Sequence, residues 1–210
     1  GLQNQYVLYR EKEGGAPEVF LDPNKFSADG TTSLAGIDFT KDGSLCAYQI
    51  SEGGSDWRKV IVLNTATKEK IGDTLHDVKF SGLSWAGNDG FFYSSYDKPK
   101  GSQLSAMTQN HKLYYHKLGT KQSTDKLIFG GSEQPRRNIG GSVTEDGKYL
   151  IISAANATYG NELYIKDLAT PDAPIRPIVT GFDNEHEVVF SDDHFLYIVT
   201  NLDAPNRRLI

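Results

Sequence analysis

Serine is the first residue type to consider, because a serine held in a glycine-rich turn can act as a nucleophile. That arrangement needs the pattern Gly-x-Ser-x-Gly between a strand and a helix, where the glycines allow the strained turn that exposes the serine oxygen. The nearest approach in this chain is Gly82-Leu-Ser-Trp-Ala86. Its last position is Ala, and the segment reads as part of a strand. We therefore expect Ser84 to be structural.

The histidines and carboxylates are the next candidates for chemistry. His111 and His116 are five residues apart in a strand-like segment, so their side chains should point to opposite faces. The remaining histidines have no partner at ligand spacing; they are His76, His186 and His194. Several carboxylates fall in expected hairpin turns, where the Asp side chain hydrogen-bonds to nearby backbone groups. They are Asp42, Asp89, Asp192 and Asp193. No glycine loop opens a helix to hold a phosphate. The sequence shows no catalytic constellation, and we expect neither a metal nor a cofactor.

A turn between two apolar strands recurs along the chain. In Ile37–Tyr48 the turn contains Asp42-Gly43, a strong hairpin signal because Gly accepts a positive φ without steric cost. The same turn returns at Asp89-Gly90 and Asp146-Gly147, and in degraded form at Asp193-His194. The successive Asp residues are 47, 57 and 47 positions apart. Repeats of roughly 40–50 residues with several strands each are typical of propeller blades.

Each repeat also contains a later strand that ends in a small-residue turn and Thr. These segments are Lys59–Thr67, Lys112–Thr120 and Glu162–Thr170. No segment shows helical periodicity with caps, and the strands are rich in Val, Ile, Tyr and Phe. We predict an all-β fold, an incomplete β-propeller of four-stranded antiparallel blades forming one partial domain over residues 1–210. Half a blade is expected at 1–27 and another at 184–210, with full blades at about 28–75, 76–131 and 136–180. Open blade faces at both ends suggest a piece of a larger propeller.

The composition excludes several classes of function. Its 22 basic and 27 acidic residues give a formal net charge of −5, whereas a nucleic-acid partner would need a clustered basic face. The pairs Arg136-Arg137 and Arg207-Arg208 are isolated and read as solvated charges. No apolar run approaches the roughly 18 residues of a membrane helix, so no membrane contact is expected. The single cysteine, Cys46, excludes an internal disulfide and lies in an apolar run that predicts a buried thiol.

Five short segments, in order, resemble the propeller of the prolyl oligopeptidase (prolyl endopeptidase) family. They are Gly1–Gln5, Val19–Asn24, Gly54–Trp57, Val78–Ser81 and His111–His116. The resemblance implies a seven-bladed propeller joined to an α/β-hydrolase domain that carries a Ser-Asp-His triad and lies outside this chain. It also implies cleavage of short peptides after proline, with the propeller gating access. The expected partners are short proline-containing peptides and the hydrolase domain of the same parent protein. The expected compartment is the cytoplasm, with the periplasm as the alternative.

The resemblance further indicates which residues line a substrate cavity. Phe80 matches the family's pocket phenylalanine, and Ile139 falls where the family can carry a pocket methionine. Both are apolar, which suits a pocket for a peptide side chain; the alternative for both is plain core packing. The loop 154–160 lacks the arginine and cysteine that can face the substrate in the family. From this loop only Thr158 is carried over as a substrate contact.

A second interpretation belongs to a different class: a stand-alone propeller scaffold that binds protein or glycan. The missing triad favours it, and propellers often serve as binding platforms. The two interpretations differ in what should follow Ile210 in the coding sequence. About three more blades and a Gly-x-Ser-x-Gly elbow would favour the peptidase, and an early stop would favour the scaffold.

Overall fold

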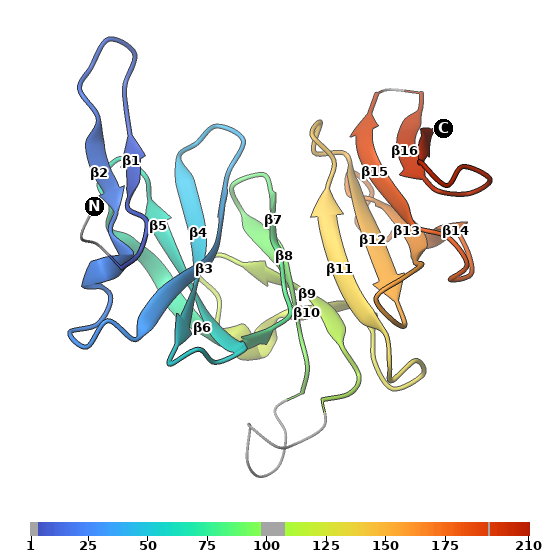
Figure 1. Ribbon diagram of the computed structural model, residues 1–210, viewed down its shortest axis with the longest axis horizontal. Helices are drawn as coiled ribbons and strands as arrows, with labels where there is room; N and C mark the ends of the chain where they lie inside the picture. Colours follow the sequence, from blue (N-terminus) through green and yellow to red (C-terminus); the bar gives the residue numbers. More distant parts are fainter. Residues whose placement is uncertain (1–3, 98–107, 193) are drawn as a thin grey trace. The chain divides into compact units, whose positions relative to one another are not determined.

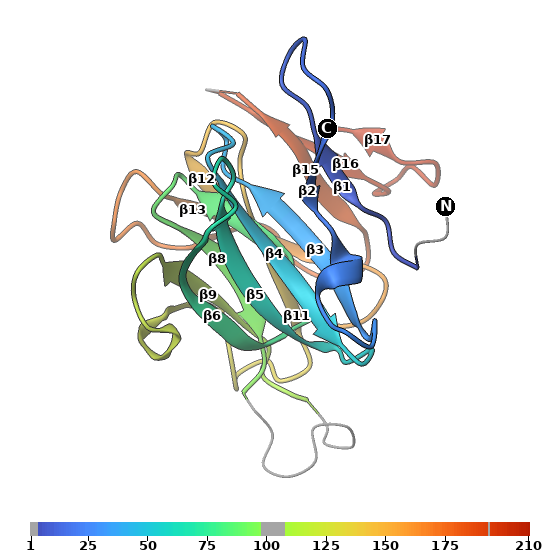
Figure 2. The same ribbon diagram turned by 90° about the vertical axis from the view of Figure 1, so that its left-hand side faces the viewer.

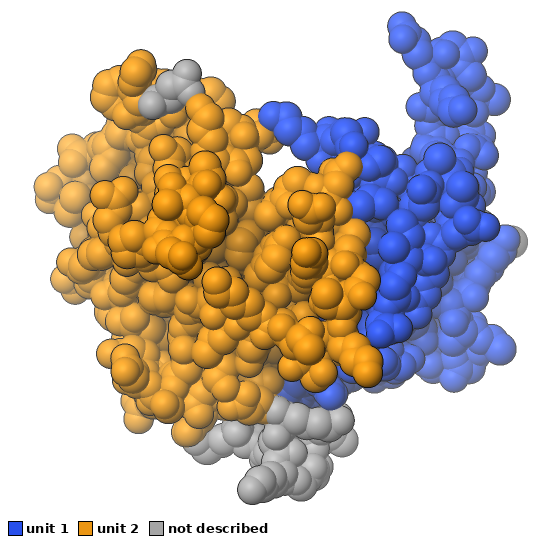
Figure 3. Space-filling view, turned by 180° about the vertical axis from the view of Figure 1, so that it is seen from behind, with its two compact units in different colours: residues 1–79 blue, residues 80–210 orange. Residues whose placement is uncertain are grey.

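The computed structural model describes residues 4–97, 108–192 and 194–210 (Figure 1). It contains two compact units, residues 1–79 and 80–210, which Figure 3 shows in separate colours. Some predicted features lie outside the described residues: the first three residues of the opening half blade, residues 98–107 of the second expected blade, and Asp193 of the degraded turn.

The first unit consists of a hairpin and a four-stranded antiparallel sheet. The hairpin pairs β1 (Leu8–Arg10) with β2 (Glu18–Leu21), and a short 3₁₀ turn, η1 (Pro23–Lys25), follows it. The sheet has the order β3 (Thr32–Phe39), β4 (Leu45–Glu52), β5 (Trp57–Asn64) and β6 (Lys70–Lys79). Figure 2 shows β3, β4 and β5 side by side.

The core of this unit lies between the hairpin and the sheet. Its buried apolar residues are Phe20, Leu21, Cys46, Tyr48 and Leu63. The Cys46 thiol is fully buried, as predicted, and this burial raises its pKa to about 12. The thiol therefore acts as a small apolar group in the core.

The closing strand of the first sheet is longer than the sequence predicted. The first full blade was expected to end near residue 75, but β6 continues to Lys79. Val78 is fully buried and pairs with Arg58, so the four residues after Leu75 belong to this sheet. The pairing of β5 with β6 contains two irregularities, which absorb extra residues on β6. Bulges of this kind interrupt the apolar alternation, and the strand end was consequently misplaced.

The second unit contains two four-stranded sheets and one three-stranded sheet, all antiparallel. The first sheet comprises β7 (Leu83–Ala86), β8 (Gly90–Ser95), β9 (Lys112–Lys117) and β10 (Lys126–Gly130), with a 3₁₀ turn, η2 (Gln122–Thr124), before β10. The second comprises β11 (Asn138–Val143), β12 (Tyr149–Ala155), β13 (Glu162–Asp167) and β14 (Arg176–Val179). The third comprises β15 (His186–Ser191), β16 (Leu196–Thr200) and β17 (Arg208–Leu209).

The middle sheet of this unit, β11–β14, is covered on both faces, as expected of a blade between two others. One face packs against the first sheet through Phe92, Leu113, Ile139, Leu150, Ile152 and Ala154. The other face packs against the third sheet through Ile151, Leu163 and Ile198. Successive residues of β12 therefore enter different cores, which follows from the alternation of side chains along a strand.

The recurring Asp residues serve the turns, as predicted. Asp42 accepts hydrogen bonds from the Thr40 hydroxyl at 2.8 Å and the Ser44 N–H at 3.0 Å. Asp146 repeats the pattern with the Thr144 hydroxyl at 2.6 Å and the Lys148 N–H at 3.0 Å. Each turn also contains a glycine with positive φ, Gly43 and Gly147. The two hairpins thus share one hydrogen-bonding scheme.

The turn at Asp89-Gly90 is built differently from its prediction. Here the glycine with positive φ is Gly87, with φ of 61°, while Gly90 is the first residue of β8. Gly90 is needed for another reason: a Cβ atom there would lie 2.1 Å from the His116 carbonyl oxygen of β9. The requirement at Gly90 comes from the close approach of a neighbouring strand.

Because neighbouring strands are antiparallel and follow chain order, the loops of each four-stranded sheet divide into two sets. The segment that enters the first strand lies at the same end as the loop between the second and third strands. In the middle sheet Asn138 pairs with Ala155, so β11 begins where β12 ends (Figure 1). The Asp146-Gly147 hairpin lies at the opposite end.

Within residues 4–97, 108–192 and 194–210, no helix has the length and apolar character that a membrane crossing requires.

Candidate functional site

Phe80 lies in the segment that enters β7. It adopts φ of 52°, a left-handed conformation that is unusual for a bulky side chain and costs about 1–3 kcal/mol. The next residue fastens the segment, because the Ser81 hydroxyl oxygen accepts a hydrogen bond from the Ser94 N–H at 2.7 Å. The Phe80 side chain remains 51% exposed. A strained backbone that presents a half-exposed aromatic ring is a candidate contact surface.

Ile139, on β11, is a core residue. It is only 2% exposed and packs with Leu113 and Leu150. It also borders a cavity of about 580 Å³ that includes Gly130 and Arg137 in its lining. The packing is close on that side too, since a Cβ atom on Gly130 would lie 2.3 Å from the Ile139 Cδ1 atom. If Ile139 contacts a molecule bound in this cavity, it therefore does so as a fixed part of the cavity lining.

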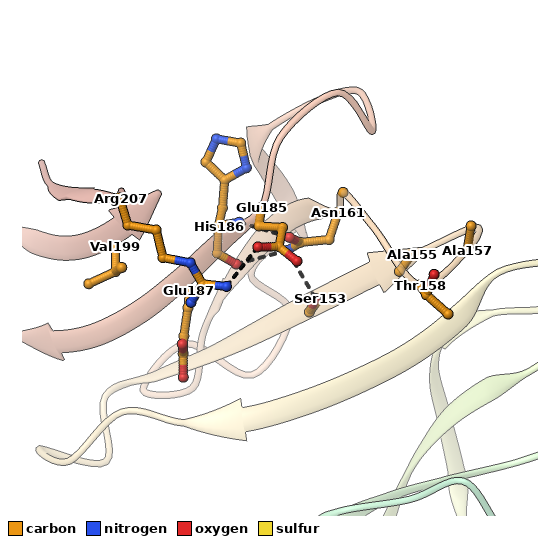
Figure 4. A pocket seen from close by; sticks show the side chains of 11 residues that line it. Ser153, Ala155, Ala157, Thr158, Asn161, Glu185, His186, Glu187, Val199 and Arg207 are labelled. Carbon is orange, nitrogen blue, oxygen red and sulfur yellow. Dashed lines mark hydrogen bonds and ion pairs between the residues drawn. The ribbon is translucent and has the colours of Figure 1, made fainter. Parts of the chain in front are cut away.

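Thr158 lies in the exposed loop between β12 and β13. It lines a cleft of about 290 Å³ between this loop and the beginning of β15 (Figure 4). The cleft is polar. Asn161 accepts a hydrogen bond from the His186 N–H at 2.8 Å and donates to the His186 carbonyl at 2.9 Å. Across the cleft, Arg207 pairs with Glu185 at 2.7 Å.

The structure brings Phe80 and Ile139 together through two other residues. The Phe80 ring meets the Tyr96 ring edge-on, with centroids 6.2 Å apart. The Tyr96 ring lies 4.4 Å from the His111 ring, and the His111 Nδ1 atom accepts a hydrogen bond from the Ile139 N–H at 2.8 Å. Thr158 has no place in this connected group. It lies at the same end of its sheet but lines the separate polar cleft.

Tyr96 is the residue of this group that the sequence interpretation missed. It follows β8 directly, and its hydroxyl donates to Asn138 Oδ1 at 2.9 Å, at the start of β11. A signal was available in the hairpin register. Leu83 pairs with Tyr93, so continuing the antiparallel pairing by three residues places Tyr96 opposite Phe80.

The prediction of solvated charges is wrong for Arg137. Its guanidinium pairs with Glu162 at 2.7 Å, with the two side chains only 13% and 9% exposed. The Tyr164 hydroxyl and the Gly181 N–H also donate to this carboxylate. The pair fastens the segment before β11 to β13. Arg136, the other member of the sequence pair, is exposed as expected.

Ser84, His111 and His116, three of the candidates for chemistry, make contacts within and between the sheets. The Ser84 hydroxyl oxygen accepts a hydrogen bond from the Val143 N–H at 2.9 Å, joining β7 to β11 as a structural residue. His111 and His116 do face opposite sides of their sheet: His111 contacts Tyr96, and His116 packs against Phe91. Among the described residues, no group of three or more His, Cys, Asp or Glu side chains is placed to hold a metal.

The four-stranded antiparallel sheets, stacked face to face within the second unit, define the chain as part of a β-propeller domain. The chain belongs to a particular family, the prolyl oligopeptidase N-terminal β-propeller domain, which matches residues 1–210.

Individual relatives agree with this assignment. The chain is 62% identical over 211 aligned residues to a prolyl endopeptidase of Elizabethkingia meningoseptica, covering all of this chain and 30% of that protein. Among solved structures, one from a study of two prolyl endopeptidases matches 99% of this chain and 30% of its own, with a TM-score of 0.88 and 32% identity. Prolyl oligopeptidase B of Galerina marginata, bound to a 25-residue macrocyclization substrate, matches with a TM-score of 0.90 and 29% identity, covering all of this chain and 33% of its own. The chain thus spans about a third of the length of these relatives.

Proposed function

We propose that this chain is the propeller part of a serine peptidase that cleaves short peptides after proline. The observation that carries the proposal is the 62% identity, over the whole chain, to a prolyl endopeptidase. The catalytic α/β-hydrolase domain is the proposed intramolecular partner, and its Ser-Asp-His triad would supply acyl transfer. The propeller would restrict the substrates that reach that triad. The same identity weighs against the scaffold alternative, since the protein that matches over the whole of this chain is a peptidase.

Phe80 is the proposed principal contact of the propeller with the peptide. Its ring is half exposed on a strained backbone, so apolar area is available for a substrate side chain. Ile139 would act as a rigid wall behind it, because it is fixed in the core. Thr158 is a weaker candidate, since its cleft is polar and separate. We place the peptidase in the cytoplasm, with the periplasm as the alternative; an unpaired, buried cysteine is compatible with a reducing compartment.

The proposal is tested on the full-length protein that contains this chain. We expect it to hydrolyse a fluorogenic proline-containing reporter peptide and to lose this activity with an active-site-directed serine inhibitor. The 210-residue chain alone should show no turnover. Phe80→Ala should lower kcat/KM about tenfold for peptides with a bulky group near the proline, equivalent to about 1.4 kcal/mol of transition-state binding.

The matched control is Phe39→Ala, which removes a partly exposed ring, 43%, from the hairpin end of β3. It should leave the kinetics unchanged. Turnover by the isolated chain that resists the inhibitor would contradict the assignment of chemistry to another domain. Equal kinetics of wild type and Phe80→Ala across a peptide series would remove Phe80 from the substrate pocket.

A further inference from the structure

We infer that Tyr96 is a positioning residue that fixes the Phe80 ring and thereby sets the discrimination between peptides with bulky and with small side chains near the proline. The inference rests on the proposed role of Phe80. It adds a residue from a different strand and assigns it a role in specificity that acts through Phe80.

The Phe80 ring needs a partner to hold it in one orientation. The ring is half exposed, and an exposed aromatic side chain can adopt several rotamers. Tyr96 limits this freedom, since the two rings meet at 81° with centroids 6.2 Å apart. That is the edge-to-face geometry which aromatic pairs prefer. A ring held in this way loses less conformational freedom when a substrate side chain packs against it.

Tyr96 is itself held on two sides. Its hydroxyl donates to Asn138 Oδ1 at 2.9 Å, and its ring lies 4.4 Å from that of His111. His111 is almost completely buried and is fixed in turn by the hydrogen bond from the Ile139 N–H. Burial raises the pKa of the Tyr96 phenol, so the hydroxyl stays protonated and remains a donor at neutral pH.

The contacts that hold Tyr96 join two sheets. Tyr96 extends β8 of the first sheet of the second unit, whereas Asn138 and Ile139 begin β11 of the next. The orientation of the Phe80 ring is therefore tied to the junction of two blades. A shift of β11 against β8 would be transmitted to the ring through Tyr96.

The test compares variants of the full-length enzyme on two proline reporter peptides that differ only in a bulky or a small neighbouring side chain. Tyr96→Leu removes both the ring contact and the hydroxyl. We expect the bulky-to-small ratio of kcat/KM to fall about fivefold, the scale of one edge-to-face ring contact. Tyr96→Phe keeps the ring and loses only the bond to Asn138, so we expect a smaller fall in the ratio. Tyr197→Phe, a hydroxyl deletion on β16, is the control and should leave the ratio unchanged.

The double variant Phe80→Ala with Tyr96→Leu separates this inference from the proposed function. If Tyr96 acts through Phe80, adding Tyr96→Leu to Phe80→Ala changes the ratio no further. Independent, additive effects would overturn the inference, as would an unchanged ratio in Tyr96→Leu while Phe80→Ala alters it. An unchanged ratio in Phe80→Ala would instead overturn the proposed role of Phe80. If Tyr96→Leu does not fold, Tyr96→Phe decides, and a ratio equal to that of Tyr197→Phe overturns the inference.

Discussion

His116, Asp125 and Tyr93 form a buried polar group away from the candidate site. The Asp125 carboxylate lies 2.8 Å from the His116 Nδ1 atom and accepts a hydrogen bond from the Tyr93 hydroxyl at 2.8 Å. The His116 and Asp125 side chains are only 3% and 2% exposed. Burial raises the pKa of the Tyr93 phenol, and the neighbouring Asp125 carboxylate raises it further. Because buried polar groups need partners, each member of this group depends on the others.

Asp125→Ala should accordingly be strongly destabilising. It leaves the His116 ring nitrogen and the Tyr93 hydroxyl without this acceptor in a buried environment, and we expect the free energy of unfolding to fall by about 3 kcal/mol. Urea denaturation followed by circular dichroism measures the change. Glu185→Ala, which breaks the exposed Arg207–Glu185 pair of the same unit, should cost less than about 1 kcal/mol. Similar losses for the two variants would show that burial does not set the strength of these pairs.

At the residue scale, the sequence correctly predicted the burial of a side chain where that burial depends only on its neighbours in the chain. Cys46 was predicted to be buried because its neighbours are apolar. Arg137 was misinterpreted because its partner, Glu162, is 25 positions away and comes near only because β11 and β13 both pair with β12. Tyr96 was missed for a related reason: its role depends on hairpin register, which single residue types do not reveal.

The glycines with positive φ allow a test of what the hairpins and loops require. Gly147 and Gly160 have nearly the same φ, 75° and 73°. A Cβ atom on Gly147 would have nothing within 4 Å, whereas one on Gly160 would lie 1.7 Å from the Phe182 carbonyl oxygen. Both positions require a left-handed backbone conformation, and they differ only in the space available for a side chain.

We expect Gly147→Ala to cost about 1 kcal/mol of unfolding free energy, the penalty of a left-handed conformation. Gly160→Ala should cost about 3 kcal/mol or more, because a backbone atom must also move. Thermal and urea denaturation of the two variants give the comparison. Equal costs would mean that the loop between β12 and β13 relaxes freely around residue 160.

At the element scale, the hairpins were predictable from the sequence because their turn chemistry is local. The Asp-Gly pairs located three described turns, although the second uses Gly87 in place of Gly90 for the positive φ. Strand ends were less predictable. The end of β6 depends on bulges, and bulges are decided by pairing with β5 rather than by the residues of β6 alone.

At the scale of the whole molecule, the repeat spacing predicted sheets of four antiparallel strands, and the structure contains three of them. The spacing could not show which side chains would remain exposed. The C-terminal sheet and its hairpin carry a group of exposed apolar residues: Val189, Phe190, Phe195, Leu209 and Ile210. Exposed apolar side chains gathered on one sheet favour association.

We therefore expect the 210-residue chain to self-associate, with an average mass in sedimentation velocity that rises with protein concentration. Phe190→Ser combined with Ile210→Ser should shift the distribution towards monomer. Tyr6→Ser, which removes an exposed aromatic side chain of the first unit, is the control and should not. A concentration-independent monomer for the unmodified chain would show that this sheet does not drive association.

The even number of strands in each complete sheet has a practical consequence. The chain leaves such a sheet at the end where it entered, so the positions of Phe80, Ile139 and Thr158 fall at one end of their sheets and the Asp146-Gly147 hairpin at the other. An affinity tag or a surface tether introduced at that hairpin would hold the protein by the end remote from the candidate contacts. Immobilised in this orientation, the chain would present the loops that carry the proposed peptide contacts to solution.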